Sequence, residues 1–386
     1  MLADVALEPG IRAGATLDPD PGLAARDIRC QLDQERMALA VVFVSDRYDR
    51  PTLAARLGQE FGAVPVIGCT SAGEIGPLGY TEGGISGFSL SADDITAEIG
   101  LLRGVAGLQS RQGQAFAHGL RQKLLTHRPK PAPDHCFALA LIDGQCRHEE
   151  NVARALNDGL GGIPMAGGSA GDDLRFVATH VLYDGHFHDD AAILLVASSR
   201  RSVTAFKTQH FVCGDRRLVV TAADPERRVV GEINGAPAAE EYARVIGLPP
   251  DRLDALVFSA HPMVVKLGGA DFVRSVQKVN PDGSMTFYCA IDEGIVFNVA
   301  EGVDMIDNLR DLFGDVASRI GHPSLVIGCD CVLRRLEMRQ KGLMDEVAGI
   351  MRGNKVVGFS TYGEQYRGMH VNQTFTGIAL GPRMAP

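Results

Sequence analysis

The sequence predicts an α/β or α+β fold, in which four βαββ-like modules form two homologous halves with mixed sheets flanked by helices. Three observations predict it. A short phrase of small and hydroxyl residues that ends in glycine and an acid recurs along the chain. The same order of apolar runs and helical segments surrounds each copy. The 45 glycines imply many tight turns, and therefore short strands.

The recurring phrase stands at residues 68–74 (GCTSAGE), 166–172 (AGGSAGD) and 358–364 (GFSTYGE). Each copy follows an apolar stub that is typical of a strand. Each then places a Ser or Thr, a small residue or Tyr, a Gly and an acid in the same order, so we align Glu74 with Asp172 and Glu364. A fainter copy occupies residues 268–271 (GGAD).

Periodicity assigns the elements around each copy. The first module is predicted to hold strands over 38–44, 64–68 and 84–90 and a helix over 52–61. The second is predicted to hold strands over 136–142, 163–166, 176–183 and 190–197 and a helix over 149–160. The last is predicted to hold strands over 324–329, 355–358 and 372–380 and one helix over 336–352.

A third, fainter module lies between the second and the last. It is predicted to have strands over 229–233 and 263–267, a helix over 237–246 and a hairpin after residue 271. Helices over 112–126 and 303–320 follow the first and third modules. This pairing of modules predicts two halves, residues 1–205 and 206–386.

Composition excludes several classes of function. The net charge of -9 provides no overall attraction for nucleic acid or anionic lipid. The apolar runs are shorter than the roughly 20 residues that span a bilayer, and the opening residues lack the basic flank of a signal peptide. The 8 cysteines are scattered through apolar runs, which is typical of free thiols in a reducing compartment. We therefore expect a cytoplasmic protein without a nucleic-acid or membrane partner.

The recurring turns could bind a ligand. Glycine turns at strand ends present backbone N–H groups, hydroxyl donors and a fixed negative charge, which suits a small polar ligand in a pocket between the halves. The predicted ligand-binding residues are Thr70, Ser71, Glu74, Ser169, Asp172, Ser360, Thr361, Tyr362, Glu364, Arg367 and Asn372. The alternative is structural, with the hydroxyls capping the turns and the acids accepting local backbone hydrogen bonds.

Residues 66–74 (VIGCTSAGE), 328–335 (GCDCVLRR) and 357–377 (VGFSTYGEQYRGMHVNQTFTG) resemble the hallmark stretches of FIST proteins, a sensory family with an N-terminal and a C-terminal FIST domain. The resemblance implies an intracellular sensor, not an enzyme. Its ligand would be small, such as an amino acid, or would be nitric oxide sensed through haem. The output would regulate a partner histidine kinase or another signalling protein, and homo-oligomer formation is left open.

Haem binding would require an axial ligand in an apolar slot. His370, within the last of these stretches, is the first candidate for the iron, and the thiol of Cys329 is an alternative. His186 and His188 form an i, i+2 pair on one face of a strand and are a further candidate metal pair. The structural alternatives are a hydrogen-bonded turn histidine, a buried small residue and a solvated hairpin tip.

A thiol-dependent enzyme is the competing class of function. Cys69 or Cys329 would act as nucleophile with His370 as base. The counterparts of Cys69 in the other copies are Gly167 and Phe359, which favours a structural position over a catalytic one.

Overall fold

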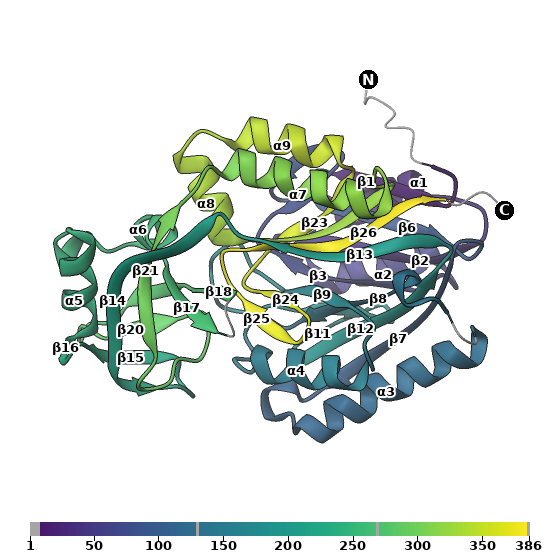
Figure 1. The fold of residues 1–386 in the computed structure, drawn as a ribbon. Coiled ribbons are helices and arrows are strands. Elements are labelled where there is room, and N and C mark those ends of the chain that lie inside the picture. Colours follow the sequence, from purple (N-terminus) through teal and green to yellow (C-terminus); the bar gives the residue numbers. More distant parts are fainter. Residues whose placement is uncertain (1–7, 129–130, 268–269, 384–386) are drawn as a thin grey trace.

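The computed structural model describes residues 8–128, 131–267 and 270–383, and it confirms a mixed α/β fold with mixed sheets flanked by helices. Within these residues, three six-stranded sheets share one strand order, and an eight-stranded sheet lies to one side of them (Figure 1). We call the three equivalent parts the first, second and third units, and residues 211–302 the insert.

The units are built from the same succession of elements. The first unit contains β1 (Ile11–Thr16), α1 (Pro21–Leu32), β2 (Met37–Ser45), α2 (Arg50–Phe61), β3 (Val66–Ser71), β4 (Glu74–Gly76), β5 (Gly79–Thr81) and β6 (Ile85–Ser91). The second contains β7 (Ile95–Arg103), α3 (Ser110–His127), β8 (Cys136–Ile142), α4 (Glu149–Gly159), β9 (Met165–Ser169), β10 (Val181–Tyr183), β11 (His186–His188) and β12 (Ala191–Ser199). The third contains β13 (Arg201–Thr208), α7 (Met305–Ile320), β22 (Leu325–Cys331), α8 (Val332–Gln340), α9 (Met344–Gly353), β23 (Val356–Thr361), β24 (Glu364–Tyr366), β25 (Met369–Val371) and β26 (Phe375–Arg383).

The insert interrupts the third unit between β13 and α7. It contains β14 (Phe211–Asp224), β15 (Val229–Ile233), β16 (Ala236–Pro237), α5 (Ala238–Ile246), α6 (Ala255–Ala260), β17 (Met263–Leu267), β18 (Ala270–Arg274), β19 (Val276–Val279), β20 (Met285–Phe287) and β21 (Val296–Gly302). Its described strand pairs are antiparallel, whereas each unit has a parallel pair at its centre: β2 with β3, β8 with β9, and β22 with β23.

The units exchange short hairpins in a cycle. The hairpin β4–β5 of the first unit pairs with β23 in the third sheet, and β24–β25 of the third unit pairs with β9 in the second sheet. The hairpin β10–β11 of the second unit pairs with β3 and completes the first sheet. Each sheet therefore ends in two strands that another unit supplies.

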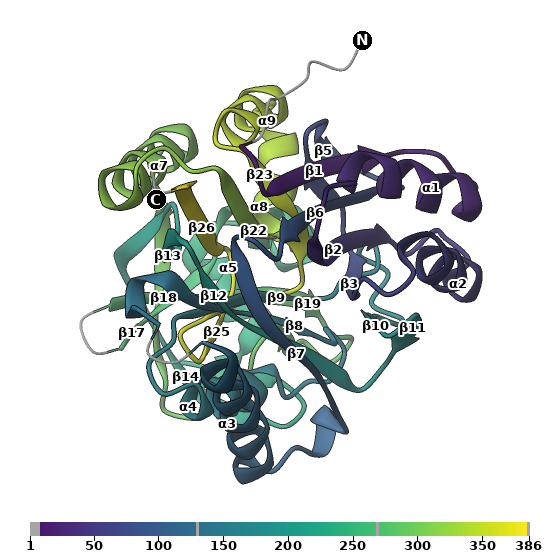
Figure 2. The same cartoon turned by 90° about the vertical axis from the view of Figure 1, so that its right-hand side faces the viewer.

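The core lies on both faces of each sheet. The inner faces meet in one central apolar cluster, where the rings of Phe43 and Phe359 stack with centroids 4.7 Å apart. Helices cover the outer faces, α1 and α2 on the first sheet, α3 and α4 on the second, and α7 and α9 on the third (Figure 2). Aspartates begin several of these helices, since Asp20, Asp49 and Asp304 each accept hydrogen bonds from first-turn N–H groups.

The predicted fourth module and the predicted last helix differ from the structure. The module predicted over residues 229–290 is not a fourth copy, because its strands belong to the antiparallel insert; the turn predicted there begins at residues 268–269, outside the described residues. The helix predicted over 336–352 is two helices, since Gly342 has a φ of 68° between α8 and α9. The predicted division after residue 205 falls inside β13 and stays a prediction about the family domains.

Residues 209–210 lead into the insert, and residues 303–304 lead back out. At the first crossing, the buried His210 lies with its Nε2 2.7 Å from Glu337 Oε2 on α8.

None of the helices in the described part of the chain combines the length and the apolar composition that crossing a membrane requires.

Candidate functional site

The three recurring turns do meet, in a ring of backbone hydrogen bonds between units. The turn after β3 bonds to β23, the turn after β23 bonds to β9, and the turn after β9 bonds to β3. The bonds run from Ala72 N to Ser360 O (3.0 Å), Ser360 N to Gly73 O (2.7 Å), Tyr362 N to Ser169 O (3.2 Å), Ser169 N to Gly363 O (2.8 Å) and Gly171 N to Thr70 O (3.0 Å). The turns thus use their backbone groups on one another.

The ring corrects the sequence alignment of the second copy by one residue. In the parallel pairs, Gly68, Gly167 and Gly358 occupy the same place, where a Cβ would lie 1.9, 1.9 and 1.7 Å from a carbonyl oxygen of the neighbouring strand. Thr70, Ser169 and Ser360 are therefore equivalent. The doubled glycine and doubled aspartate of the second copy permit either register in the sequence, and the close approach of the strands selects this one.

Glu74 and Glu364 have matching structural surroundings. Both are fully buried. Glu74 accepts hydrogen bonds from Ser71 Oγ at 2.6 Å and from Gly84 N at 3.2 Å. Glu364 accepts them from the Thr361 hydroxyl and from the backbone and hydroxyl of Thr374. Burial raises the pKa of each carboxyl to about 8, despite these hydrogen bonds. Each acid fixes the start of an exchanged hairpin.

In the corrected register Asp173 is the counterpart of Glu74 and Glu364, so Asp172 has a different structural role. The buried carboxylate of Asp172 accepts hydrogen bonds from the backbone N–H groups of Phe176, Val177 and Ala178 and from the Tyr362 hydroxyl. It holds residues 172–180, which we call the second-unit loop, against the third turn.

The other predicted ligand-binding residues divide by exposure. Ser360 and Asn372 are fully buried, and the Ser360 hydroxyl and both Asn372 amide atoms have no hydrogen-bond partner among the described residues. Arg367 is exposed and lies over the Tyr366 ring. Only Tyr362 of the predicted set borders a cavity described below, and the ligand role of the rest stays a prediction.

Of the predicted metal ligands, His370 and Cys329 are buried, and His186 and His188 lie on a hairpin strand. His370 is 4% exposed, with Nδ1 3.2 Å from Gln365 Nε2, and burial lowers its pKa to about 4. Cys329 is fully buried, and burial raises the pKa of its thiol. His186 and His188 lie on β11, beside a cavity of about 310 Å³. Among residues 8–128, 131–267 and 270–383, no three His, Cys, Asp or Glu side chains are grouped to hold a metal ion.

Cys69, the nucleophile of the enzyme alternative, is also fully buried. Burial raises the pKa of its thiol well above the usual value, so the thiol is protonated at neutral pH. Within the described residues, no hydrogen bond joins it to a histidine.

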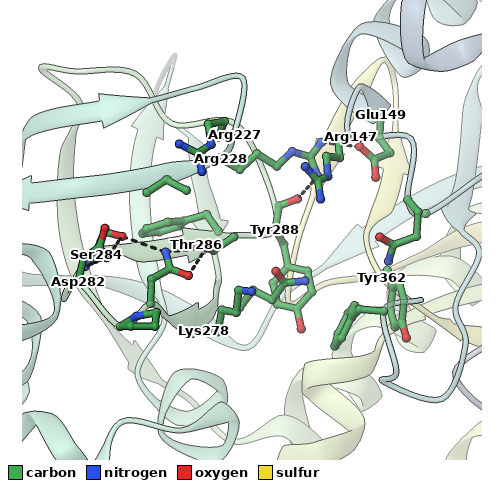
Figure 3. Close-up of a pocket in the computed structure, with 18 residues that line it drawn as sticks. Arg147, Glu149, Arg227, Arg228, Lys278, Asp282, Ser284, Thr286, Tyr288 and Tyr362 are labelled. Atoms are coloured by element: carbon green, nitrogen blue, oxygen red, sulfur yellow. Dashed lines mark hydrogen bonds and ion pairs between the residues drawn. The ribbon is translucent and has the colours of Figure 1, made fainter. Parts of the chain in front are cut away.

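The main cavity, of about 610 Å³, lies between the insert and the second unit (Figure 3). It opens beyond the carboxyl ends of the parallel strands β8 and β9, a common place for ligands in α/β proteins. Its lining comes from the loop before α4, the second-unit loop, the third turn and the insert. The lining residues are Gly144, Gln145, Arg147, Glu149, Phe176, Arg227, Arg228, Val229, Gln277, Lys278, Asn280, Pro281, Asp282, Ser284, Thr286, Phe287, Tyr288 and Tyr362.

A buried ion pair joins the two walls of this cavity. Arg228 of the insert donates to Glu149 and, at 2.8 Å, to Glu150 at the start of α4. It also donates to the backbone oxygen of Tyr288 at 2.8 Å. Burial raises the pKa of Glu149 to about 7, while the two carboxylates raise the pKa of Arg228. Arg228 therefore links the position of the insert to that of the second unit.

Three aromatic rings line one part of the cavity. Phe176 stacks on Tyr362 with ring centroids 4.5 Å apart and lies 5.9 Å from the Tyr288 ring. These three rings come from the second-unit loop, the third turn and the insert. Both segments in which the chain departs from its threefold pattern thus contribute to the cavity.

A second cavity, of about 560 Å³, lies beside α2 and β10. Its lining is apolar or glycine apart from Tyr183 and Asp184. It lacks the converging polar groups that fix the orientation of a ligand, so the main cavity is the better candidate site.

Comparisons with known proteins give three results. The FIST N domain model matches residues 38–236, and the FIST C domain model matches residues 238–367. A solved structure, titled as cyanuric acid hydrolase from A. caulinodans, is similar with a TM-score of 0.38 and 8% identity, covering 97% of this chain and 99% of that chain. We draw nothing from a similarity this low. No curated protein matches the chain.

Proposed function

We propose that the ligand of this chain binds in the main cavity. The chain belongs to the FIST family, whose domains are signal-transduction sensors of small ligands. One observation carries the proposal: the lining comes from both the insert and the second unit. A ligand that contacts both walls favours one relative position of the insert and the second unit, and a partner protein can bind that arrangement selectively.

The output is proposed to pass to a separate signalling protein, for which the sequence resemblance suggests a histidine kinase. The contact between Arg228 and the two glutamates supports this route, because it lies at the cavity and joins the parts whose relation would change. Ligand binding that strains or relieves this contact changes the position of the insert without chemical conversion of the ligand.

A single-tryptophan reporter tests the site. The sequence contains no tryptophan, so Phe176→Trp places the sole indole emission in the cavity wall. A panel of metabolites, including amino acids, is screened by thermal shift and then by emission. The matched control is Val177→Trp, at a position that is 78% exposed. We expect a ligand that raises Tm in both variants to change the emission of the Phe176→Trp protein alone. A ligand that raises Tm and leaves both emissions unchanged binds elsewhere and contradicts the proposal.

Haem-based nitric oxide sensing stays a narrower proposal, suggested by the sequence resemblance. The two predicted axial ligands do not fit haem in this conformation, because neither His370 nor Cys329 lines any of the cavities described above. An absorption spectrum of the freshly purified protein tests it. A Soret band that shifts with nitric oxide would support haem, whereas colourless protein that takes up no haem would leave the metabolite ligand.

A further inference from the structure

The lining of the main cavity is positively charged within an acidic protein. Arg147, Arg227 and Lys278 are exposed side chains of this lining, and none has an ion-pair partner in the part of the chain that the structure describes. They come from both walls, Arg147 from the second unit and the other two from the insert (Figure 3). The chain as a whole carries a net charge of -9. An unpaired group of cations there favours a negatively charged ligand over a neutral one.

The acids of the lining are already engaged. Glu149 is paired with Arg228, and Asp282 accepts hydrogen bonds from the backbone and hydroxyl of Ser284 at 3.0 and 2.6 Å. Glu150 lies behind Arg228 and is paired with it as well. With these three acids counted against Arg228, Arg147, Arg227 and Lys278, a positive charge remains. Among the described lining residues, Asp282 alone has a carboxylate without a cation partner, and its Oδ1 already accepts both hydrogen bonds from Ser284.

The aromatic part of the lining limits the ligand further. The Phe176 ring is partly exposed and packs on Tyr362, with Tyr288 adjacent. Guanidinium groups hold carboxylate or phosphate by paired hydrogen bonds, while an aromatic face holds a ring or an alkyl group. The two chemistries occur in one cavity.

We propose that the ligand is an organic oxyanion, a carboxylate or a phosphate, bound by Arg147, Arg227 and Lys278 with its apolar part against Phe176. This inference rests on the proposed function and names the ligand class of that site.

Calorimetry with five small probes tests the ligand class. The probes are benzoate, phenyl phosphate, inorganic phosphate, benzamidine and benzyl alcohol, each added to the full chain and to the Phe176→Trp reporter. We expect benzoate or phenyl phosphate to bind and to change the reporter emission, with inorganic phosphate weaker than phenyl phosphate. The stronger of the two aryl anions identifies the acid group. Affinity should fall as salt is raised, because the attraction is partly exposed to solvent.

Three variants test the residues. Arg147→Gln, Arg227→Gln and Lys278→Gln should each weaken binding of the aryl anion about tenfold, the effect of losing one charge-assisted hydrogen bond. Lys123→Gln on α3 and Arg26→Gln on α1 remove exposed cations away from the cavity and should leave the affinity unchanged.

The outcomes separate this inference from the proposed function. Benzamidine or benzyl alcohol binding at the reporter as tightly as the anions would overturn the ligand class and leave the cavity as the site. Binding of neither aryl anion, or equal affinity in the three cavity variants and the two controls, would also overturn it. A metabolite that stabilises the protein without reaching the reporter would instead overturn the proposed function.

Discussion

The ring of turns and the main cavity meet at Tyr362, yet they use polar groups in opposite ways. In the ring, backbone groups are bonded to one another across units, and the buried Glu74 and Glu364 accept hydrogen bonds within their own units. In the cavity, cations on exposed side chains are left without partners among the described residues. The ring repeats in all three units, whereas the cavity occurs where the second-unit loop and the insert break the repeat. Repetition here serves stability, and departure from it provides a site. Four changes test this contrast.

The largest effect is expected from Gly358→Ala in the strand that leads into the ring. The new methyl group would lie 1.7 Å from Gly328 O in the neighbouring strand, so the two backbones must separate. We expect a loss of about 3 kcal/mol in the free energy of unfolding, measured by urea denaturation. The control is Gly349→Ala on α9, where no atom lies within 4 Å of the new methyl. Equal stability of the two variants would show that the strands are not this close.

Arg228→Gln is expected to have the next largest effect, because it removes the contact between the insert and α4. Glu149 is left buried without its cation. Since burial already raises the pKa of Glu149 to about 7, this group can take up a proton, and we expect a cost of about 2 kcal/mol. Hydrogen exchange should rise at the start of α4 and around Tyr288 while the first sheet stays protected. A uniform increase over all three sheets would contradict a local linking role.

The buried acids of the ring predict a dependence of stability on pH. The pKa of Glu74 and of Glu364 is raised from 4.5 to about 8 in the folded protein. Their stabilising contribution is therefore complete below pH 4.5 and is lost as the pH rises to 8. Stability should therefore fall as the pH rises through this window. The Glu74→Gln/Glu364→Gln variant should show a flatter stability profile than the natural protein. Parallel profiles would show that both acids ionise in the folded state.

The smallest change in stability is expected in the cavity. Arg227→Gln alters an exposed side chain without an ion-pair partner in the described residues, so the free energy of unfolding should change by no more than about 0.5 kcal/mol. Urea denaturation beside Arg228→Gln measures this. A loss comparable to that of Arg228→Gln would mean that Arg227 has a structural role, which would weaken the contrast between ring and cavity.

Local patterns predicted much of the fold. The apolar run over 136–142 and the run over 229–233 are strands with the predicted bounds, and the helix predicted over 112–126 lies within α3. The recurring phrase correctly located the turns that meet. These features depend on residues close in sequence, which is why periodicity and turn chemistry identify them.

The exchange of hairpins could not be predicted in this way. Each exchanged strand has three residues, too few for a periodic signal, and its partner lies in another unit. The fourth module was predicted because the strands over 229–233 and 263–267 are real, but local patterns do not say whether strands pair in parallel.

The cavity cations were also missed. Arg147, Arg227 and Lys278 lie in loops or short strands and match no motif. One signal was available, because adjacent arginines at 227 and 228 precede a strand in a net acidic chain. Only the packing of the insert on the second unit brings them near Arg147.

The exchange of hairpins sets an order for synthesis on the ribosome. The hairpin β4–β5, made within residues 74–81, pairs with β23, which spans residues 356–361. The edge of β4 that pairs with β23 therefore has no partner until some 280 further residues have been translated. Until then, other strands could pair with the backbone groups of this edge. Nascent chains of this protein should depend on holding chaperones until the third unit emerges.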